Sequence, residues 1–201
     1  MQHLAIAAAA TAIAIGAGSG ALSSMTATPQ KPPVEVSNPM IAGTAMSPDE
    51  SIFRNAASSP EHAKFVAEIR AAGLAPKLDG AGSYTVFAPT DAAYAALGKD
   101  GTAFAMKSAQ RNARYLVVKG QYDSTRLLQL IEEQGGRAKL RTLEGGTIVA
   151  SFNGPTNIIL MDERGTTADI AIYDIRQKNG VMQIIDRVLE PGHAARQVAE
   201  R

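Results

Sequence analysis

The residues that could carry out acid–base or metal chemistry are few in this sequence, and they are not grouped. The 201 residues contain three histidines, His3, His62 and His193, and no cysteine. The lack of cysteine removes thiol nucleophiles, disulfides, cysteine-bound zinc and iron–sulfur clusters. His62 has no histidine partner four residues further on, which a metal site on a helix would require. We therefore predict no metal and no cofactor, and we expect His62 to be exposed to solvent on the first turn of a helix.

A second group of candidate ligands consists of carboxylates. Asp162, Glu163 and Asp169 lie near one predicted hairpin, and carboxylate oxygens in a loop are ligands for calcium. Arg164 interrupts the group, and no Asp-x-Asp-x-Asp series is present, so an exposed turn is the preferred interpretation. A Ser-His-Asp arrangement would have to use His62 as its base, and no Gly-x-Ser-x-Gly turn is present. We therefore predict no catalytic residues and a protein that is not an enzyme.

The composition excludes further classes of function. Lys and Arg number 20 against 19 Asp and Glu, which argues against a protein that follows nucleic-acid phosphates. Aromatic residues make up 5% and tryptophan is absent, so stacking platforms for bases are not expected. No block of basic residues would suit an anionic membrane surface. The expected partners are therefore neither nucleic acid nor lipid headgroups.

The first residues have the order of a secretory signal. Leu4–Ala17 is an apolar run interrupted by Thr11, and Ser19-Gly20-Ala21 offers a small-x-small cleavage pattern. We predict a signal peptide over residues 1–21 and an exported protein, periplasmic or extracellular. The alternative is an uncleaved anchor helix, which is the one membrane contact that we expect. The run is shorter than the roughly 20 strongly apolar residues that span a bilayer.

The remaining chain divides into three parts. Residues 22–48 include a stretch rich in Pro, Ser and Thr and predict a flexible lead-in. Residues 49–191 carry periodic patterns and predict one domain without internal repeats. Residues 192–201 form a polar C-terminal tail.

Within the domain, helical patterns come mainly first and strand patterns second. Helices are expected to start at Ser59, at Thr90 or Asp91, at Ser108 and at Asp123 or Ser124, where capping residues precede apolar periodicity. Strands are expected at 84–88, 116–118, 138–143, 147–152, 157–161, 168–174 and 181–189, several of them separated by Gly-Gly or Asn-Gly turns. This succession predicts an α+β domain.

Three of these segments carry a resemblance to a known family. Residues 84–94 (YTVFAPTDAAY) and 179–189 (NGVMQIIDRVL) resemble the paired signatures of the fasciclin-domain family. Residues 115–122 (YLVVKGQY) are similar to the family's central Tyr-His segment. The resemblance implies a wedge of two packed β-sheets flanked by several α-helices, and a role in cell adhesion or in binding protein or polysaccharide partners at the cell surface or in the matrix.

The resemblance also gives candidate binding residues. Tyr115, Leu116 and Tyr122 belong to the central segment and are our candidates for contact with a partner. The family often has histidine where this chain has Leu116, and many relatives have histidine where it has Gln183. Histidine-dependent binding is therefore not transferred to this chain. We expect Tyr115 to be a partly buried tyrosine whose hydroxyl is hydrogen-bonded.

An alternative function is kept beside adhesion. The domain could carry a small hydrophobic ligand in a cleft between its helical and sheet layers. Phe65, Tyr94, Tyr115 and Phe152 are the candidate lining residues, and they are equally good core residues.

Overall fold

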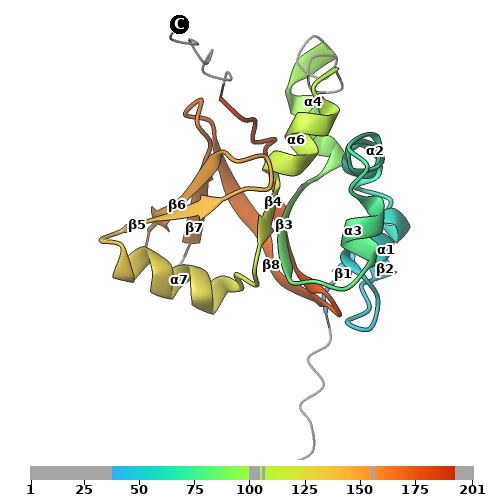
Figure 1. The fold of residues 1–201 in the computed structure, drawn as a ribbon, viewed down its shortest axis with the longest axis horizontal. Coiled ribbons are helices and arrows are strands. Elements are labelled where there is room, and N and C mark those ends of the chain that lie inside the picture. Colours follow the sequence, from blue (N-terminus) through green and yellow to red (C-terminus); the bar gives the residue numbers. More distant parts are fainter. Residues whose placement is uncertain (1–37, 100–104, 106, 155–156, 193–201) are drawn as a thin grey trace, which may run out of the picture. The chain divides into compact units, whose positions relative to one another are not determined.

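The structure is a computed structural model in which residues 38–99, 105, 107–154 and 157–192 are described (Figure 1). The predicted signal peptide lies outside these residues, as does the predicted tail apart from Gly192. Among the described residues, no helix has both the length and the apolar character needed to cross a membrane.

The helices lie mainly in the first half of the domain. They are α1 (Ile52–Ser58), α2 (Ala63–Ala71), α3 (Ala75–Asp79), α4 (Asp91–Ala96), α6 (Ala109–Tyr115) and α7 (Ser124–Glu133). Of these helices, α1, α4 and α7 begin at side-chain caps. Thr90 Oγ1 accepts a hydrogen bond from the Ala93 amide, and Asp123 Oδ1 accepts one from the Arg126 amide, as the sequence predicts.

Seven strands form one continuous sheet in the order β4-β3-β9-β8-β7-β6-β5. They are β3 (Tyr84–Pro89), β4 (Val117–Lys119), β5 (Arg137–Arg141), β6 (Thr147–Asn153), β7 (Asn157–Met161), β8 (Thr167–Gln177) and β9 (Gly180–Ile185). The sheet is antiparallel except for β3 and β9, which run parallel. The predicted α+β class is therefore confirmed.

The long strand β8 joins two halves of this sheet. Its first residues pair with β7, and residues 170–177 pair with β9 with two register shifts. One half therefore contains β4, β3, β9 and β8, and the other contains β8, β7, β6 and β5 (Figure 1). Val118 also bridges to Thr142, so the end of β5 meets β4, the strand at the other edge of the sheet.

The core joins the helices to the sheet. Strand β9 is buried along its whole length, and so are Val86 and Phe87 of β3. Each of the two segments that resemble the fasciclin signatures therefore contains a central strand of the core. Buried Val188 and Leu189 follow β9 and continue this contact beyond the strand.

The start of α2 differs from the prediction. Ser59 ends α1, and α2 begins three residues later than expected, with His62 in the capping position. The carboxylate of Asp91 accepts hydrogen bonds from the amides of Ala63 and Lys64, so the first turn of α2 is capped by a residue of α4. A local pattern cannot reveal a cap that comes from 27 residues away.

The predicted lead-in contains folded residues near its end. Residues 40–41 (β1) and 44–45 (β2) form a two-stranded sheet, and Ile41 and Met46 are buried in the core. The folded part therefore begins before residue 49.

Candidate binding site

Tyr115 lies at the end of α6 and is fully buried. Its hydroxyl donates a 2.7 Å hydrogen bond to the Thr147 carbonyl and accepts a 3.2 Å bond from the Glu163 amide. Burial raises the pKa of Tyr115 well above its usual range. The hydroxyl is hydrogen-bonded as expected, but the side chain is completely buried. Tyr115 thus connects α6, the start of β6 and the turn after β7.

The turn after β7 is built around Asp162, which is buried. Asp162 Oδ1 accepts bonds from the amides of Arg164 and Thr166, each at 2.8 Å, and Oδ2 accepts a 3.0 Å bond from the Glu190 amide. Glu163 accepts bonds from the amides of Thr147 and Gly192. Residues 163–166 of the turn are exposed as expected, whereas Asp162 is buried. The carboxylates of Asp162 and Glu163 bind backbone amides, and Asp169 Oδ1 accepts a 3.1 Å bond from the Asn153 side chain.

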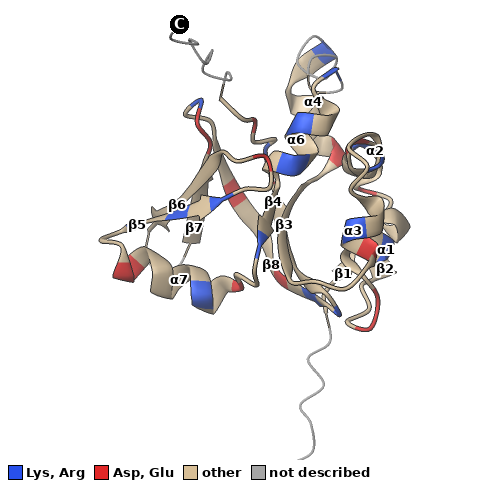
Figure 2. Ribbon diagram, in the orientation of Figure 1, with Lys and Arg blue, Asp and Glu red and all other residues tan. Residues whose placement is uncertain are grey.

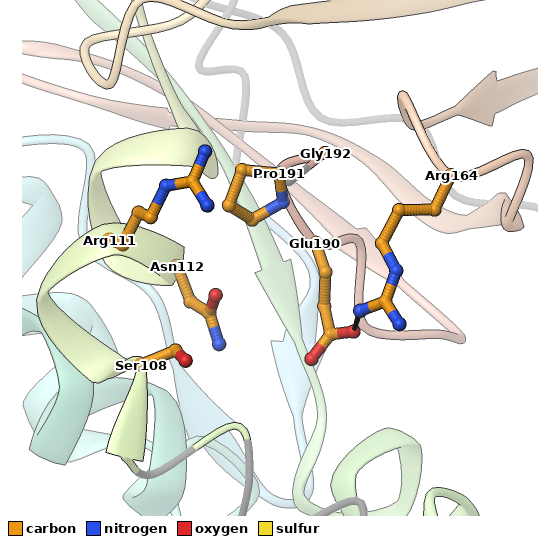
Figure 3. Close-up of a pocket in the computed structure, with 7 residues that line it drawn as sticks. All are labelled: Ser108, Arg111, Asn112, Arg164, Glu190, Pro191 and Gly192. Carbon is orange, nitrogen blue, oxygen red and sulfur yellow. Dashed lines mark hydrogen bonds and ion pairs between the residues drawn. The ribbon is translucent and has the colours of Figure 1, made fainter. Parts of the chain in front are cut away.

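A small hollow of about 40 Å³ lies between this turn and α6 (Figure 3). Ser108, Arg111 and Asn112 border it on one side, and Arg164 and Glu190 on the other. Both arginines form ion pairs, Arg164 with Glu190 and Arg111 with Glu144 at 2.7 Å. The size of the hollow suits one or two water molecules better than an organic ligand.

The predicted binding residues are not brought together. Leu116 follows Tyr115 and is fully buried, whereas Tyr122 lies beyond the other end of β4 and is half-buried. The amide of Tyr122 donates a 2.8 Å bond to Thr85 Oγ1, and the Thr85 hydroxyl donates to the Gly120 carbonyl. The side chains of Tyr115 and Leu116 therefore belong to the core, and Tyr122 is the one of the three that remains partly accessible.

Gln183 is buried and anchors a partly buried polar network. Its Nε2 donates to the Tyr122 carbonyl at 3.1 Å and to Asp174 Oδ1 at 2.9 Å, and its Oε1 accepts from the Asp174 amide at 2.8 Å. Asp174 has φ of 59° and accepts hydrogen bonds from the amide and the hydroxyl of Ser124. This network ties the first turn of α7 to β8 and β9.

A second buried polar group was not predicted. Glu68 is fully buried, with Oε2 bonded to the Tyr94 hydroxyl at 2.8 Å and Oε1 without a partner among the described residues. Burial raises the pKa of Glu68 to about 7. One signal in the sequence could have revealed it, because residue 68 follows Phe65 by three positions and precedes Ile69 on the apolar side of α2.

The expectation that His62 is solvent-exposed is wrong. The residue is fully buried, with Nδ1 2.7 Å from Ser59 Oγ and Nε2 without a partner within the described residues. Burial lowers the pKa of His62, against the attraction of Asp91. His62 is buried because it precedes α2 directly and α2 packs against α4 and α6. In the described residues, no group of three or more His, Asp and Glu side chains could hold a metal ion.

The candidate ligand-lining aromatics are placed in different surroundings. Phe65, Tyr94 and Tyr115 are fully buried, and Phe152 is 39% exposed near the end of β6. Four surface hollows, of about 40, 330, 180 and 490 Å³, are lined mainly by polar and charged residues, and none of the four aromatics lines any of these hollows. These hollows lack the apolar lining that a hydrophobic ligand needs.

Comparisons with known proteins agree with this geometry. A family model described as the fasciclin domain matches residues 60–191. The chain is 28% identical over 145 residues to an uncharacterized protein of Synechocystis sp., a match that covers 71% of this chain and 98% of the relative. The solved structure of a FAS1 domain pair from the insect cell adhesion molecule Fasciclin I is similar, with a TM-score of 0.52 and 18% identity. That match covers 63% of this chain and 44% of the insect chain.

Proposed function

The chain belongs to the fasciclin-domain family, and we propose that it is an exported, non-enzymatic module for cell adhesion or for binding protein or polysaccharide partners outside the cytoplasm. The observation that carries this proposal is the use of two of its buried polar side chains. Asp162 and Gln183 bind backbone groups that hold the turns and strands in place. Groups used in this way stabilise a rigid surface and are not available as acids, bases or nucleophiles.

The surface available for binding carries both positive and negative charges. Figure 2 shows basic and acidic residues spread over most of the described elements. Such a mixed surface suits a protein or polysaccharide partner better than a polyanion like nucleic acid. Of the three binding residues that the sequence suggests, Tyr122 is the one that we expect to contribute directly.

The ligand-carrier alternative has less support. Phe65, Tyr94 and Tyr115 fill the core, and they would have to move to open a cavity. Native mass spectrometry of protein purified from its own host tests this alternative, because a carrier would retain a ligand of defined mass.

Binding of the purified, labelled protein to intact cells and to their extracellular matrix tests the adhesion function. We expect saturable binding that unlabelled protein displaces. A suitable control is the same protein heat-unfolded and then cleared of aggregates. Binding that does not saturate, or that the unfolded protein reproduces, would contradict the proposal.

A further inference from the structure

The edge strand β5 presents three cations in one row. Arg137, Lys139 and Arg141 alternate with the buried residues Ala138 and Leu140. Alternate residues of a strand point to the same face and lie about 7 Å apart. None of the three cations forms an ion pair with another described residue. All the charged residues of β5 are therefore basic and free to meet an anionic partner.

Apolar side chains lie beside this row on the same face. The register places Val149 of β6 opposite Lys139 and Met161 of β7 opposite Val149. Ile159 lies opposite Ser151, which itself lies opposite Arg137. Val149, Ile159 and Met161 are only half-buried, and we call these three residues with the three β5 cations the outer face of β5–β7.

No described helix covers this outer face. The helix α7 contacts β5 and β6, whose inward side chains Ala138 and Ile148 are fully buried. Because α7 covers the inner face, the outer face keeps its row of cations and its apolar strip of Val149, Ile159 and Met161. The cations and the strip are about 5–10 Å apart, which is the distance across one or two strands.

We propose that the outer face of β5–β7 binds an acidic amphipathic helix of a partner protein, an inference that rests on the proposed binding function. A helix about 10 Å wide covers two strands, so its apolar stripe would lie on Val149, Ile159 and Met161. Acidic residues along one flank, about 6 Å apart at i and i+4, would then meet the β5 cations.

Other occupants fit less well. A second copy that faced this surface with β5 against β5 would bring three cations opposite three cations. An anionic polysaccharide would use the cations and gain little from the apolar strip. A partner strand added to the edge would have to displace Gln134, whose Oε1 accepts a 3.1 Å hydrogen bond from the Lys139 amide. The cations could also serve to keep the exposed sheet edge from pairing with another chain and aggregating. That role would not require the neighbouring apolar strip.

The test uses the full chain and a synthetic 18-residue amphipathic helix with a leucine stripe and a row of glutamates on one flank. Its control peptide has the same composition, with the glutamates moved to the side opposite the leucines. We expect the first peptide to bind at least about tenfold more tightly, measured by fluorescence anisotropy, because its acids can reach the cations while its leucines contact the sheet.

Two protein variants locate the binding. The triple variant Arg137→Glu, Lys139→Glu, Arg141→Glu should weaken binding of the first peptide at least about tenfold. The control triple variant Lys77→Glu, Lys99→Glu, Lys178→Glu makes the same change in net charge at exposed sites outside β5–β7. It should change the affinity for the first peptide less than about twofold. Val149→Thr with Ile159→Thr keeps β-branched side chains and should weaken binding about threefold or more.

Each other outcome overturns the inference. Equal effects of the two triple variants would mean that net charge alone attracts the peptide. No effect of the two threonine substitutions, together with equal binding of an oligouronate, would assign the cations to polysaccharide. Failure of the first peptide to bind would remove the site. Cell and matrix binding is measured on the same proteins. If the unmodified protein binds the matrix but not the first peptide, this inference alone is overturned, whereas absence of matrix binding by the unmodified protein overturns the proposed function.

Discussion

The Tyr94 hydroxyl of α4 donates a 2.8 Å hydrogen bond to Glu68 Oε2 of α2, and both side chains are fully buried. A carboxyl group in this position is more costly to ionise than in water, because few polar groups replace its hydration. Burial accordingly raises the pKa of Glu68 from 4.5 to about 7. Near pH 7 about half of the folded molecules therefore still carry a proton on Glu68, whereas the unfolded chain has lost it.

The first prediction is a loss of stability as the pH rises. Between pH 4.5 and 7 the folded protein holds a proton on Glu68 that the unfolded chain has released, so the free energy of unfolding falls with increasing pH. The contribution of Glu68 over this range is at most about 3 kcal/mol. The lowered pKa of His62 acts in the opposite direction, since stability is lost as the pH falls below 6.5.

The variant Glu68→Gln separates the two effects. It keeps an oxygen for the Tyr94 hydroxyl and removes the titrating proton, so it should be more stable than the unmodified protein at pH 8 by about 1–3 kcal/mol. Urea unfolding at pH 5 and pH 8 measures the difference between the two proteins at each pH. A difference that does not grow from pH 5 to pH 8 would show that Glu68 is not the titrating group.

The second prediction concerns Tyr115 as a structural residue. Tyr115→Phe removes the bonds to the Thr147 carbonyl and the Glu163 amide and should lower the free energy of unfolding by about 1–2 kcal/mol. Because the ring stays buried, binding to cells and matrix should be unchanged. Tyr122→Phe is the matched control, since its hydroxyl lies on a half-buried side chain, and the cost should be below about 0.5 kcal/mol. Lost binding with unchanged stability of Tyr115→Phe would instead make Tyr115 a contact residue.

Local features of this fold could be predicted from the sequence. Caps such as Thr90 and Asp123 bond to amides three residues away, and the Gly-Gly and Asn-Gly turns that separate the strands act over two to four residues. The limits of β7 agree with the expectation, and those of β6 differ by one residue. The fasciclin resemblance was confirmed because its segments carry core positions whose order is fixed by the fold.

The features that failed depend on contacts between distant residues. Asp91 caps a helix that begins 28 positions earlier, and His62 directly precedes this helix, which packs against α1, α4 and α6. The parallel pairing of β3 with β9 joins segments almost a hundred residues apart, so no local pattern indicates it. The burial of Tyr115 and Leu116 depends on such contacts as well, since the type of residue 115 or 116 does not tell whether its neighbours bury it.

The third prediction tests the network around Gln183. Gln183→Met keeps the length of the side chain and removes its amide, which leaves the Asp174 amide and the Tyr122 carbonyl without their partners. The expected cost is about 1–3 kcal/mol, because polar groups with little access to water are destabilising when they lose their partners. Hydrogen exchange of the Ser124 amide should quicken, since Gln183 orients the carboxylate that accepts its bond.

Gln134→Met is the control for this substitution. The Gln134 side chain also accepts a bond from a backbone amide, that of Lys139, but at the protein surface, where water can replace it. Its cost should be below about 1 kcal/mol. If the two methionine variants lose similar stability, the Gln183 network contributes no more than a surface hydrogen bond.

The fourth prediction concerns the contact between β3 and β9 at Gly180. A Cβ atom at this position would lie 1.9 Å from the Tyr84 carbonyl oxygen, and its φ of 153° is one that other residues rarely adopt. Gly180→Ala should therefore separate the two strands and cost more than about 3 kcal/mol, because backbone atoms cannot move aside as a flexible side chain can. Gly165→Ala provides the comparison, since its φ is 85° and no atom lies within 4 Å of the added methyl group. That variant should cost only the backbone strain, about 1–2 kcal/mol. Thermal and urea unfolding of both variants measures the difference, and equal losses would mean that β3 and β9 are not in close contact at Gly180.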